Sequence, residues 1–394
     1  MMCVFFGAQI LRVVRAGECS TGERVTVDVW GMQIAVISQI RADSPKAHAI
    51  NVIKTAGGFE RLGHSVTVYC LEGSGREEPG AAYGERGLRW RFAAEGLDAE
   101  AFGRWAADAA KADRTEFVYG RSFWGPLLTA EGGLASVVES HAHVGTENPM
   151  LDRVLSMTRD CEAMRAVVTI GRVLVDDFVR RGGERSQVHV VADGVDFELF
   201  ERAAVRAYEG KGPHVVYTGH LYDYKGIPTV LEAAGLSGGA QFHLVGGLVE
   251  DIDRTRNRIG RMGLGNVRLH GWVDHARVAS WTKGADVLLL PQSAGEASKD
   301  WTSPVKLGEY LASGAEVVVS RIPALVDVLD GEPVVWFEPD DAGSLAEAVG
   351  EALEHVGNES RSERRREMAR GLSYAARAGR ILEAAGFESA KVAA

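Results

Sequence analysis

Cysteine is scarce in this sequence and long apolar runs are absent from it. The 394 residues include four cysteines, which lie far apart with no C-x-x-C pair and no Cys/His cluster at metal-ligand spacing. We therefore expect reduced thiols in a cytoplasmic protein, with no disulfide framework and no metal site. No apolar run approaches the roughly 20 residues of a membrane-spanning helix. The first residues make a poor signal peptide, because no charged segment precedes their short apolar patch.

Two nucleotide-binding motifs and an excess of positive charge are also missing. No G-x-G-x-x-G motif follows either opening strand and no Walker lysine motif occurs, which counts against a dinucleotide oxidoreductase and a P-loop NTPase. Lys and Arg number 44 against 54 Asp and Glu, a net charge of −10. Long-range attraction to nucleic acid is therefore not expected, and any positively charged site must be local.

The sequence does contain two series of short apolar runs that alternate with amphipathic helical stretches. This alternation predicts an α/β fold with doubly wound, Rossmann-like domains that face a central cleft. The first series begins at Met32, a candidate start of the chain, and the second begins at His214 after a polar stretch. The expected parts are an N-terminal extension (1–31), an N-terminal domain (32–205), a C-terminal domain (206–370), and a last helix with its tail (371–394).

Two lysines stand at predicted helix N-termini in the second half. In "DWTSPVKLGEYLASG", Ser303 fits an N-cap and Pro304 the first helical position, so Lys306 falls in the first turn. Lys225 directly precedes the helix that follows "HVVYTG". Unpaired N–H groups already make a helix N-terminus positive, so each cation has the wrong sign unless an anion shares the site. A diphosphate held by both lysines would satisfy this requirement.

The alternative for each lysine is an ordinary surface ion pair. Lys306 is three residues from Glu309 on one helix face, and Lys225 is close in sequence to Asp223. Such pairs contribute only about 0.2–0.5 kcal/mol. Other polar residues follow predicted strands: Glu139, His141 and Arg121 in the first half and Trp272 in the second. A solvated or packed role is open for each of these, and Asp251 and Asp253 read as a capped helix start and not as a ligand pair.

The second half resembles the GT-B glycosyltransferases, in particular the retaining family 4. The resemblance rests on "VVYTGHLYDYKGIPTVLEAA", "VRLHGWV", "ADVLLLPQS" and "TSPVKLGEYLASG", in the family's order and spacing. The first half is similar through "SPKAHAINVIKTAGGFERLGHSVTVYC", "VVESHAHV" and "VVADGVDFELF". The resemblance implies a GT-B fold whose last helix crosses back onto the first domain.

The resemblance also implies roles for individual residues. It places a nucleotide-sugar's diphosphate on Lys225 and on the helix start with Lys306, and its ribose on Glu309. It places His141 beside the transferred sugar, with the base beside Trp272 and Val273. The donor site then consists of Gly219, His220, Lys225, Trp272, Val273, Thr302, Ser303, Pro304, Lys306 and Glu309. The acceptor side consists of Ala47, His48, Arg121 and Glu139.

Two positions depart from the family pattern. His220 stands where many members have an arginine, and it is a weaker, pH-dependent cation. Trp301 stands where many members have a glutamate. These departures leave the choice of donor sugar open.

The leading interpretation is a metal-independent, retaining hexosyltransferase of glycan biosynthesis. The resemblance implies a UDP- or GDP-linked sugar as substrate, no cofactor, and a glycan, lipid-linked or small-molecule acceptor. A lipid acceptor would bring peripheral contact with the inner face of the membrane, although no anchor is readable. The alternatives are a non-hydrolysing sugar-nucleotide epimerase of GT-B fold and a non-catalytic nucleotide-sugar-binding module. The sequence gives no oligomeric state.

Overall fold

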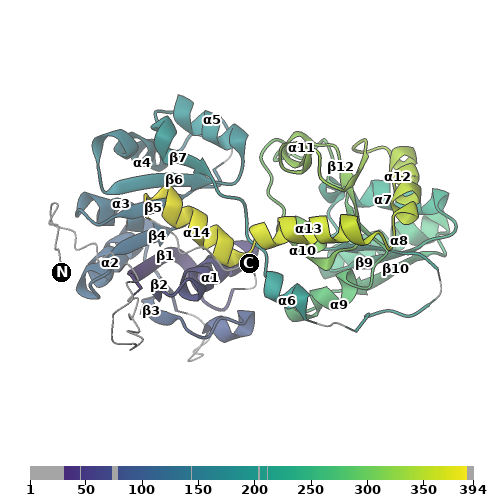
Figure 1. The fold of residues 1–394 in the computed structure, drawn as a ribbon, viewed down its shortest axis with the longest axis horizontal. Helices are drawn as coiled ribbons and strands as arrows, with labels where there is room; N and C mark the ends of the chain where they lie inside the picture. Colours follow the sequence, from purple (N-terminus) through teal and green to yellow (C-terminus); the bar gives the residue numbers. More distant parts are fainter. Residues whose placement is uncertain are drawn as a thin grey trace, which may run out of the picture.

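A computed structural model of the chain describes residues 31–44, 46–72, 79–142, 144–202, 205–210 and 212–387. The predicted N-terminal extension, apart from Gly31, and the end of the tail lie outside these residues. Within them the apolar runs form two all-parallel sheets, each packed on both faces by apolar clusters, and the two lie side by side in Figure 1. This arrangement confirms the expected α/β fold.

The first sheet has seven strands in the order β3-β2-β1-β4-β5-β6-β7. The sequence pattern missed β3, because Arg89 and Arg91 interrupt its apolar character at the edge of the sheet. The strands are β1 (Gln33–Arg41), β2 (Ser65–Leu71), β3 (Arg89–Ala93), β4 (Phe117–Gly120), β5 (Ser136–Glu139), β6 (Met164–Thr169) and β7 (Val188–Val190). The helices between them are α1 (Ala47–Arg61), α2 (Ala99–Ala112), α3 (Trp124–Glu131), α4 (Pro149–Asp160) and α5 (Arg172–Arg180).

The second sheet has six strands in the order β10-β9-β8-β11-β12-β13. They are β8 (His214–Thr218), β9 (Gln241–Val245), β10 (Val267–Gly271), β11 (Val287–Leu290), β12 (Glu316–Ser320) and β13 (Val335–Phe337). Its helices are α6 (Phe197–Glu201), α7 (Ile227–Leu236), α8 (Val249–Met262), α9 (Val278–Thr282), α10 (Val305–Ser313), α11 (Pro323–Leu329), α12 (Ala342–Glu354) and α13 (Glu359–Gly371). None of the described helices is long and apolar enough to cross a bilayer.

The last helix, α14 (Tyr374–Ala384), returns to the first sheet, as expected from the sequence (Figure 1). Ala378, Ile381 and Leu382 join the apolar core that α1 covers. Gly58 permits this close packing, since a Cβ there would lie 2.2 Å from the carbonyl oxygen of Tyr374. The end of the chain is therefore part of the first domain's core.

Strand order reverses once in each sheet, between β1 and β4 and between β8 and β11. Open α/β sheets bind ligands beyond the carboxyl ends of their strands at such points. Loops from these ends of the two sheets also meet each other. The N–H of Asp193, after β7, donates to Ser303 Oγ at 3.1 Å. The backbone of Trp301 lies 3.5 Å from where a Cβ on Gly171, after β6, would stand.

Candidate active site

Lys225 and Lys306 lie close together at the reversal point of the second sheet. Lys225 ends a short 3-10 turn directly before α7, and Lys306 is the second residue of α10. Burial, together with the positive charge of Lys225, lowers the pKa of Lys306 to about 7. Burial also lowers the pKa of Lys225. The two ammonium groups thus repel each other in a partly desolvated place, at the N-termini of two helices.

Gly219 makes room for Lys306 beside β8. Its φ is +127°, and a Cβ there would lie 2.7 Å from Lys306 Nζ. The same ammonium lies 4.0 Å from the centre of the Tyr217 ring. A side chain at position 219 would therefore push the lysine away from the loop after β8.

The ion-pair alternative is wrong for both lysines. Glu309 instead accepts a hydrogen bond from His275 Nε2 at 2.9 Å. Asp223 accepts two from Arg258, each 2.8 Å long. Within the part of the chain that the structure describes, neither lysine has a hydrogen bond or ion pair, and their contacts are with the rings of Tyr217 and Tyr224. Two half-buried cations without such pairs need a bound anion to balance their charge, and this strengthens the argument made from the sequence.

The start of α10 differs from the prediction. The helix begins at Val305 and Pro304 is its N-cap, with no side chain capping the helix. Ser303 is not the N-cap because its hydroxyl accepts the Asp193 N–H from the first domain. The N–H of Thr302 donates to the Ser298 carbonyl at 2.8 Å. The first turn of α10 is consequently left without a side-chain cap, as an anion site requires.

His275 is a partner of Glu309 that the sequence reading missed. Burial opposes the charged imidazole, but the hydrogen bond and charge of Glu309 outweigh it and raise the pKa of His275. Asp196 raises this pKa further and Lys54 of α1 lowers it, so all four groups share one interdomain cluster. The only sequence signal was the position of His275 close behind Trp272 and Val273.

The remaining predicted donor residues lie around the same sheet edge. His220 is exposed, and its ring stacks on Tyr222 at 4.9 Å between centres. Trp272 is 64% exposed and follows β10, two strands away from β8. Val273 beside it packs partly against the core. Among the described residues, no hydrogen bond or cation–π contact joins either lysine to Trp272 or Val273.

His141, Arg121 and Glu139 form one hydrogen-bonded group at the end of β4 and β5. Arg121 Nη2 lies 2.7 Å from His141 Nδ1, and His141 Nε2 lies 2.8 Å from Glu139 Oε1. A guanidinium can only donate, so Nδ1 accepts and Nε2 carries the proton that Glu139 accepts. Both ring nitrogens of His141 are therefore occupied.

Glu139 is buried beneath this group and does not line the acceptor side directly. It also accepts hydrogen bonds from Tyr119 Oη at 2.6 Å and from Arg377 of α14. Burial alone would raise the pKa of Glu139, but Arg377 and His141 hold it well below its ordinary value. Glu139, His141 and Asp193 lie close enough to ligate a metal ion. Their atoms fit one poorly, since Arg377 and Arg121 already occupy the carboxylate and the imidazole and oppose a further cation.

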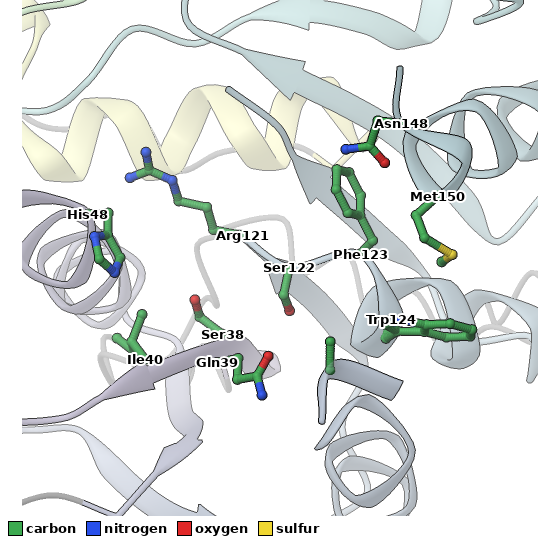
Figure 2. A pocket seen from close by; sticks show the side chains of 11 residues that line it. Ser38, Gln39, Ile40, His48, Arg121, Ser122, Phe123, Trp124, Asn148 and Met150 are labelled. Carbon is green, nitrogen blue, oxygen red and sulfur yellow. The ribbon is translucent and has the colours of Figure 1, made fainter. Parts of the chain in front are cut away.

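A pocket of about 480 Å³ lies at the reversal point of the first sheet, next to this group (Figure 2). Arg121 and His48 both line it, His48 from α1 and Arg121 from the loop after β4, whereas the predicted Ala47 does not line it. Burial, Arg121 and Lys46 all lower the pKa of His48. The other residues that line the pocket are Ser38, Gln39, Ile40, Ala99, Ser122, Phe123, Trp124, Asn148 and Met150.

The hydrogen-bonded group of Glu139, His141 and Arg377 in the first domain lies near Glu309 of the second domain. Tyr374 of α14 is within electrostatic range of Glu309 on one side and of Arg377 on the other. The structure thus brings Lys225, Lys306 and Gly219 together on one domain and His141, Arg121, Glu139 and His48 on the other.

Comparison with known proteins agrees with this architecture. Residues 50–199 match the family model "Glycosyltransferase Family 4", and residues 212–355 match "Glycosyl transferases group 1". The phosphatidyl-myo-inositol mannosyltransferase of Mycobacterium tuberculosis is 32% identical over 201 residues, 47% of this chain and 51% of the relative. The D-inositol 3-phosphate glycosyltransferase of Xylanimonas cellulosilytica is 26% identical over 257 residues, 60% of each chain. The chain thus spans about half the length of the curated relatives it matches.

Two solved structures show the same fold. A glycosyltransferase from Rickettsia africae has a TM-score of 0.72 at 15% identity, covering 90% of this chain and 98% of the other. Anabaena HepE in complex with UDP has a TM-score of 0.69 at 14% identity, covering 89% and 99%. At this identity the likeness concerns the fold alone.

Proposed function

The chain belongs to the group 1 and family 4 glycosyltransferases of GT-B fold, and we propose that it moves a hexose from a nucleoside diphosphate sugar to an acceptor hydroxyl with retention of configuration. The observation that carries the proposal is the pair formed by Lys225 and Lys306. Among the described residues, neither ammonium group has a hydrogen bond or close ion pair with a carboxylate, although Glu296 and Glu309 lie within electrostatic range of Lys225 and Lys306. The two groups, at two helix N-termini, match the charge of a diphosphate.

The same groups suit the chemistry of the departing nucleoside diphosphate. As the bond between the sugar C1 and the phosphate oxygen breaks, its electron pair stays on the phosphate while the sugar gains oxocarbenium character. Preorganised cations and N–H dipoles stabilise that charge directly. The acceptor oxygen then bonds to C1 on the same face, and its proton passes to the leaving phosphate oxygen. Lys225, Lys306 and the α10 terminus supply the positive charge that a metal ion supplies elsewhere, so the proposed reaction needs no metal and no cofactor.

The acceptor is proposed to carry a phosphate. Among the described residues, none that lines the 480 Å³ pocket is acidic, and Arg121 and His48 are its basic groups. Phe123 and Trp124 offer flat apolar faces to a ring. The names of two relatives, a phosphatidyl-myo-inositol mannosyltransferase and a D-inositol 3-phosphate glycosyltransferase, share a phosphorylated cyclitol. A lipid-borne acceptor would place the protein at a membrane surface.

A two-step experiment tests the proposal. Thermal shift with UDP, GDP and their hexose conjugates identifies the donor, and NMR of the donor with and without phosphorylated acceptors then follows the anomeric carbon. Transfer with retained configuration supports the proposal. Conversion of the donor sugar without any acceptor would instead indicate an epimerase. Binding without consumption in any acceptor pool would indicate a binding module.

A further inference from the structure

Arg121 is placed to interact with two different groups, the His141–Glu139 pair and a ligand in the pocket. Its Nη2 donates to His141 Nδ1 at 2.7 Å, and its Nε lies 3.7 Å from Glu139 Oε1. The same side chain lines the 480 Å³ pocket, as does His48 (Figure 2). An anion in that pocket would compete with His141 for the guanidinium.

The hydrogen bonds of His141 decide what happens to its ring when Arg121 moves. Because Glu139 accepts from Nε2 and Arg121 donates to Nδ1, the ring offers no free nitrogen to a substrate. Glu139 cannot release Nε2 readily, since it is buried and fixed by Tyr119 and Arg377. Nδ1 is therefore the atom that can be freed, and only Arg121 has to move for that.

We propose that Arg121 is a positioning residue that makes the hydrogen bonding of His141 depend on acceptor binding. A phosphate group on the acceptor draws Arg121 into the pocket. His141 Nδ1 is then free to accept a hydrogen bond from a hydroxyl of the donor sugar. This inference rests on the proposed function. The phosphate can belong to a soluble ester or to a lipid headgroup, since the guanidinium recognises the same anion in both. Until the acceptor arrives, the occupied His141 leaves the donor poorly oriented, which limits its loss to water.

The polar groups near Arg121 are consistent with its movement from His141 to a phosphate in the pocket. The pocket offers neutral hydroxyl groups from Ser38 and Ser122 that can complete the coordination of a phosphate, whereas the Asn148 Oδ1 already caps α4. His48 lies within electrostatic range of Arg121, which adds to the burial that lowers the His48 pKa. The carboxylate near Arg121 is Glu139, which already has three shorter partners. Glu139 therefore keeps these three partners when Arg121 moves away.

The direct test observes the His141 ring in the full chain by ¹⁵N NMR, with its signals assigned by their loss in His141→Gln. Inorganic phosphate should shift the Nδ1 signal saturably, towards the value that Arg121→Gln shows without phosphate. Arg121→Gln itself should not respond, whereas Arg104→Gln, an exposed arginine on α2, should behave as the wild type. The response should persist in a Lys225→Ala/Lys306→Ala background, which excludes phosphate bound to the lysines. An unchanged Nδ1 signal, or an equal shift in Arg121→Gln, would overturn the inference.

A kinetic measurement separates this inference from the transferase proposal. With the donor found by thermal shift, Arg121→Gln should raise basal release of nucleoside diphosphate about tenfold, the effect of one hydrogen bond, and should abolish stimulation by phosphate. A merely structural arginine would lower both rates. Turnover that phosphate leaves unchanged refutes the role of Arg121, whereas no nucleotide-sugar turnover with an intact NMR response refutes the transferase proposal. Stimulation by myo-inositol 1-phosphate or by phosphatidylinositol vesicles tells the two phosphate sources apart.

Discussion

Arg377, in the last helix, forms a fully buried ion pair with Glu139, 238 residues earlier in the chain. Glu139 in turn fixes the proton of His141 on Nε2. The return of α14 to the first domain therefore does more than complete an apolar core. It supplies the charge that holds the polar group beside the pocket in place.

Replacing Arg377 should destabilise the first domain strongly. Arg377→Met leaves the Glu139 carboxylate buried without its counter-ion, and removal of one partner from such a pair costs about 3–5 kcal/mol. Urea unfolding of the full chain should show this loss, and the double variant Glu139→Gln/Arg377→Met should recover part of it. Arg364→Met, which breaks a half-exposed pair with Glu332, should cost no more than about 1 kcal/mol. Equal losses for the two arginines would contradict the buried-pair account.

Nucleotide binding should take up a proton at pH 8. Lys306 has a pKa of about 7 in the free protein, so it is mostly neutral at pH 8. A bound diphosphate favours the ammonium form and raises that pKa, so the affinity should fall about tenfold per pH unit above pH 7. Calorimetry in buffers of different ionisation enthalpy measures the uptake, which should approach one proton. Uptake that survives in Lys306→Met would exclude this lysine as the proton's destination.

Lys306→Met should also stabilise the protein without ligand. The lowered pKa means that the folded state disfavours the charged lysine, and methionine removes that penalty while keeping most of the side-chain volume. We expect the melting temperature to rise by a few degrees while nucleotide binding is lost. A melting temperature that falls together with binding would instead indicate a structural lysine.

A cluster of three histidines, of which His214 and His243 are buried and His270 is half-buried, should make the second domain sensitive to acid. His243 bonds to His214 and to His270, each at 3.0 Å between ring nitrogens, and burial together with these neighbours lowers the pKa of His243 to about 4. The unfolded chain therefore binds more protons between pH 6.5 and pH 4, so stability should fall as the pH is lowered through that range, by about 3 kcal/mol for this group. Denaturation curves across these pH values measure the slope, which should be smaller in His243→Phe. An unchanged slope would contradict the assignment.

Trp301 should hold the two domains together. Its backbone lies against Gly171, and its side chain packs on the apolar cluster that contains Leu155 and Phe178. Trp301→Ala should remove about 1–3 kcal/mol of interdomain packing. Small-angle scattering should then report a larger radius of gyration, whereas Trp272→Ala, a change at an exposed site, should leave it unchanged. Equal radii for Trp301→Ala and the wild type would exclude this role.

Local patterns were sufficient to predict most strands and the placement of the two lysines. Lys225 and Lys306 follow apolar runs and precede helices, and these short-range signals fix a residue's place at a sheet edge. The N-cap assignment of Ser303 failed because its hydroxyl is used by Asp193, which is remote in sequence. A propensity cannot foresee a competing tertiary partner.

Hydrogen bonds and ion pairs between segments far apart in the chain could not be predicted from the sequence. Nothing near Arg377 in the sequence indicates Glu139, and nothing near His275 indicates that it would occupy Glu309. The availability of both lysines also became clear only when their sequence neighbours, Glu309 and Asp223, were found paired elsewhere.

The shared anion site is tested most directly by calorimetric titration of UDP and GDP into three proteins. These are the wild type, the Lys225→Ala/Lys306→Ala variant and, as a control, Lys111→Ala at an exposed position of α2. The two-lysine model predicts that one nucleotide binds the wild type and the control equally, and that the double variant loses at least about a hundredfold in affinity, the effect of two charge-assisted hydrogen bonds. Equal affinity in all three proteins would contradict it.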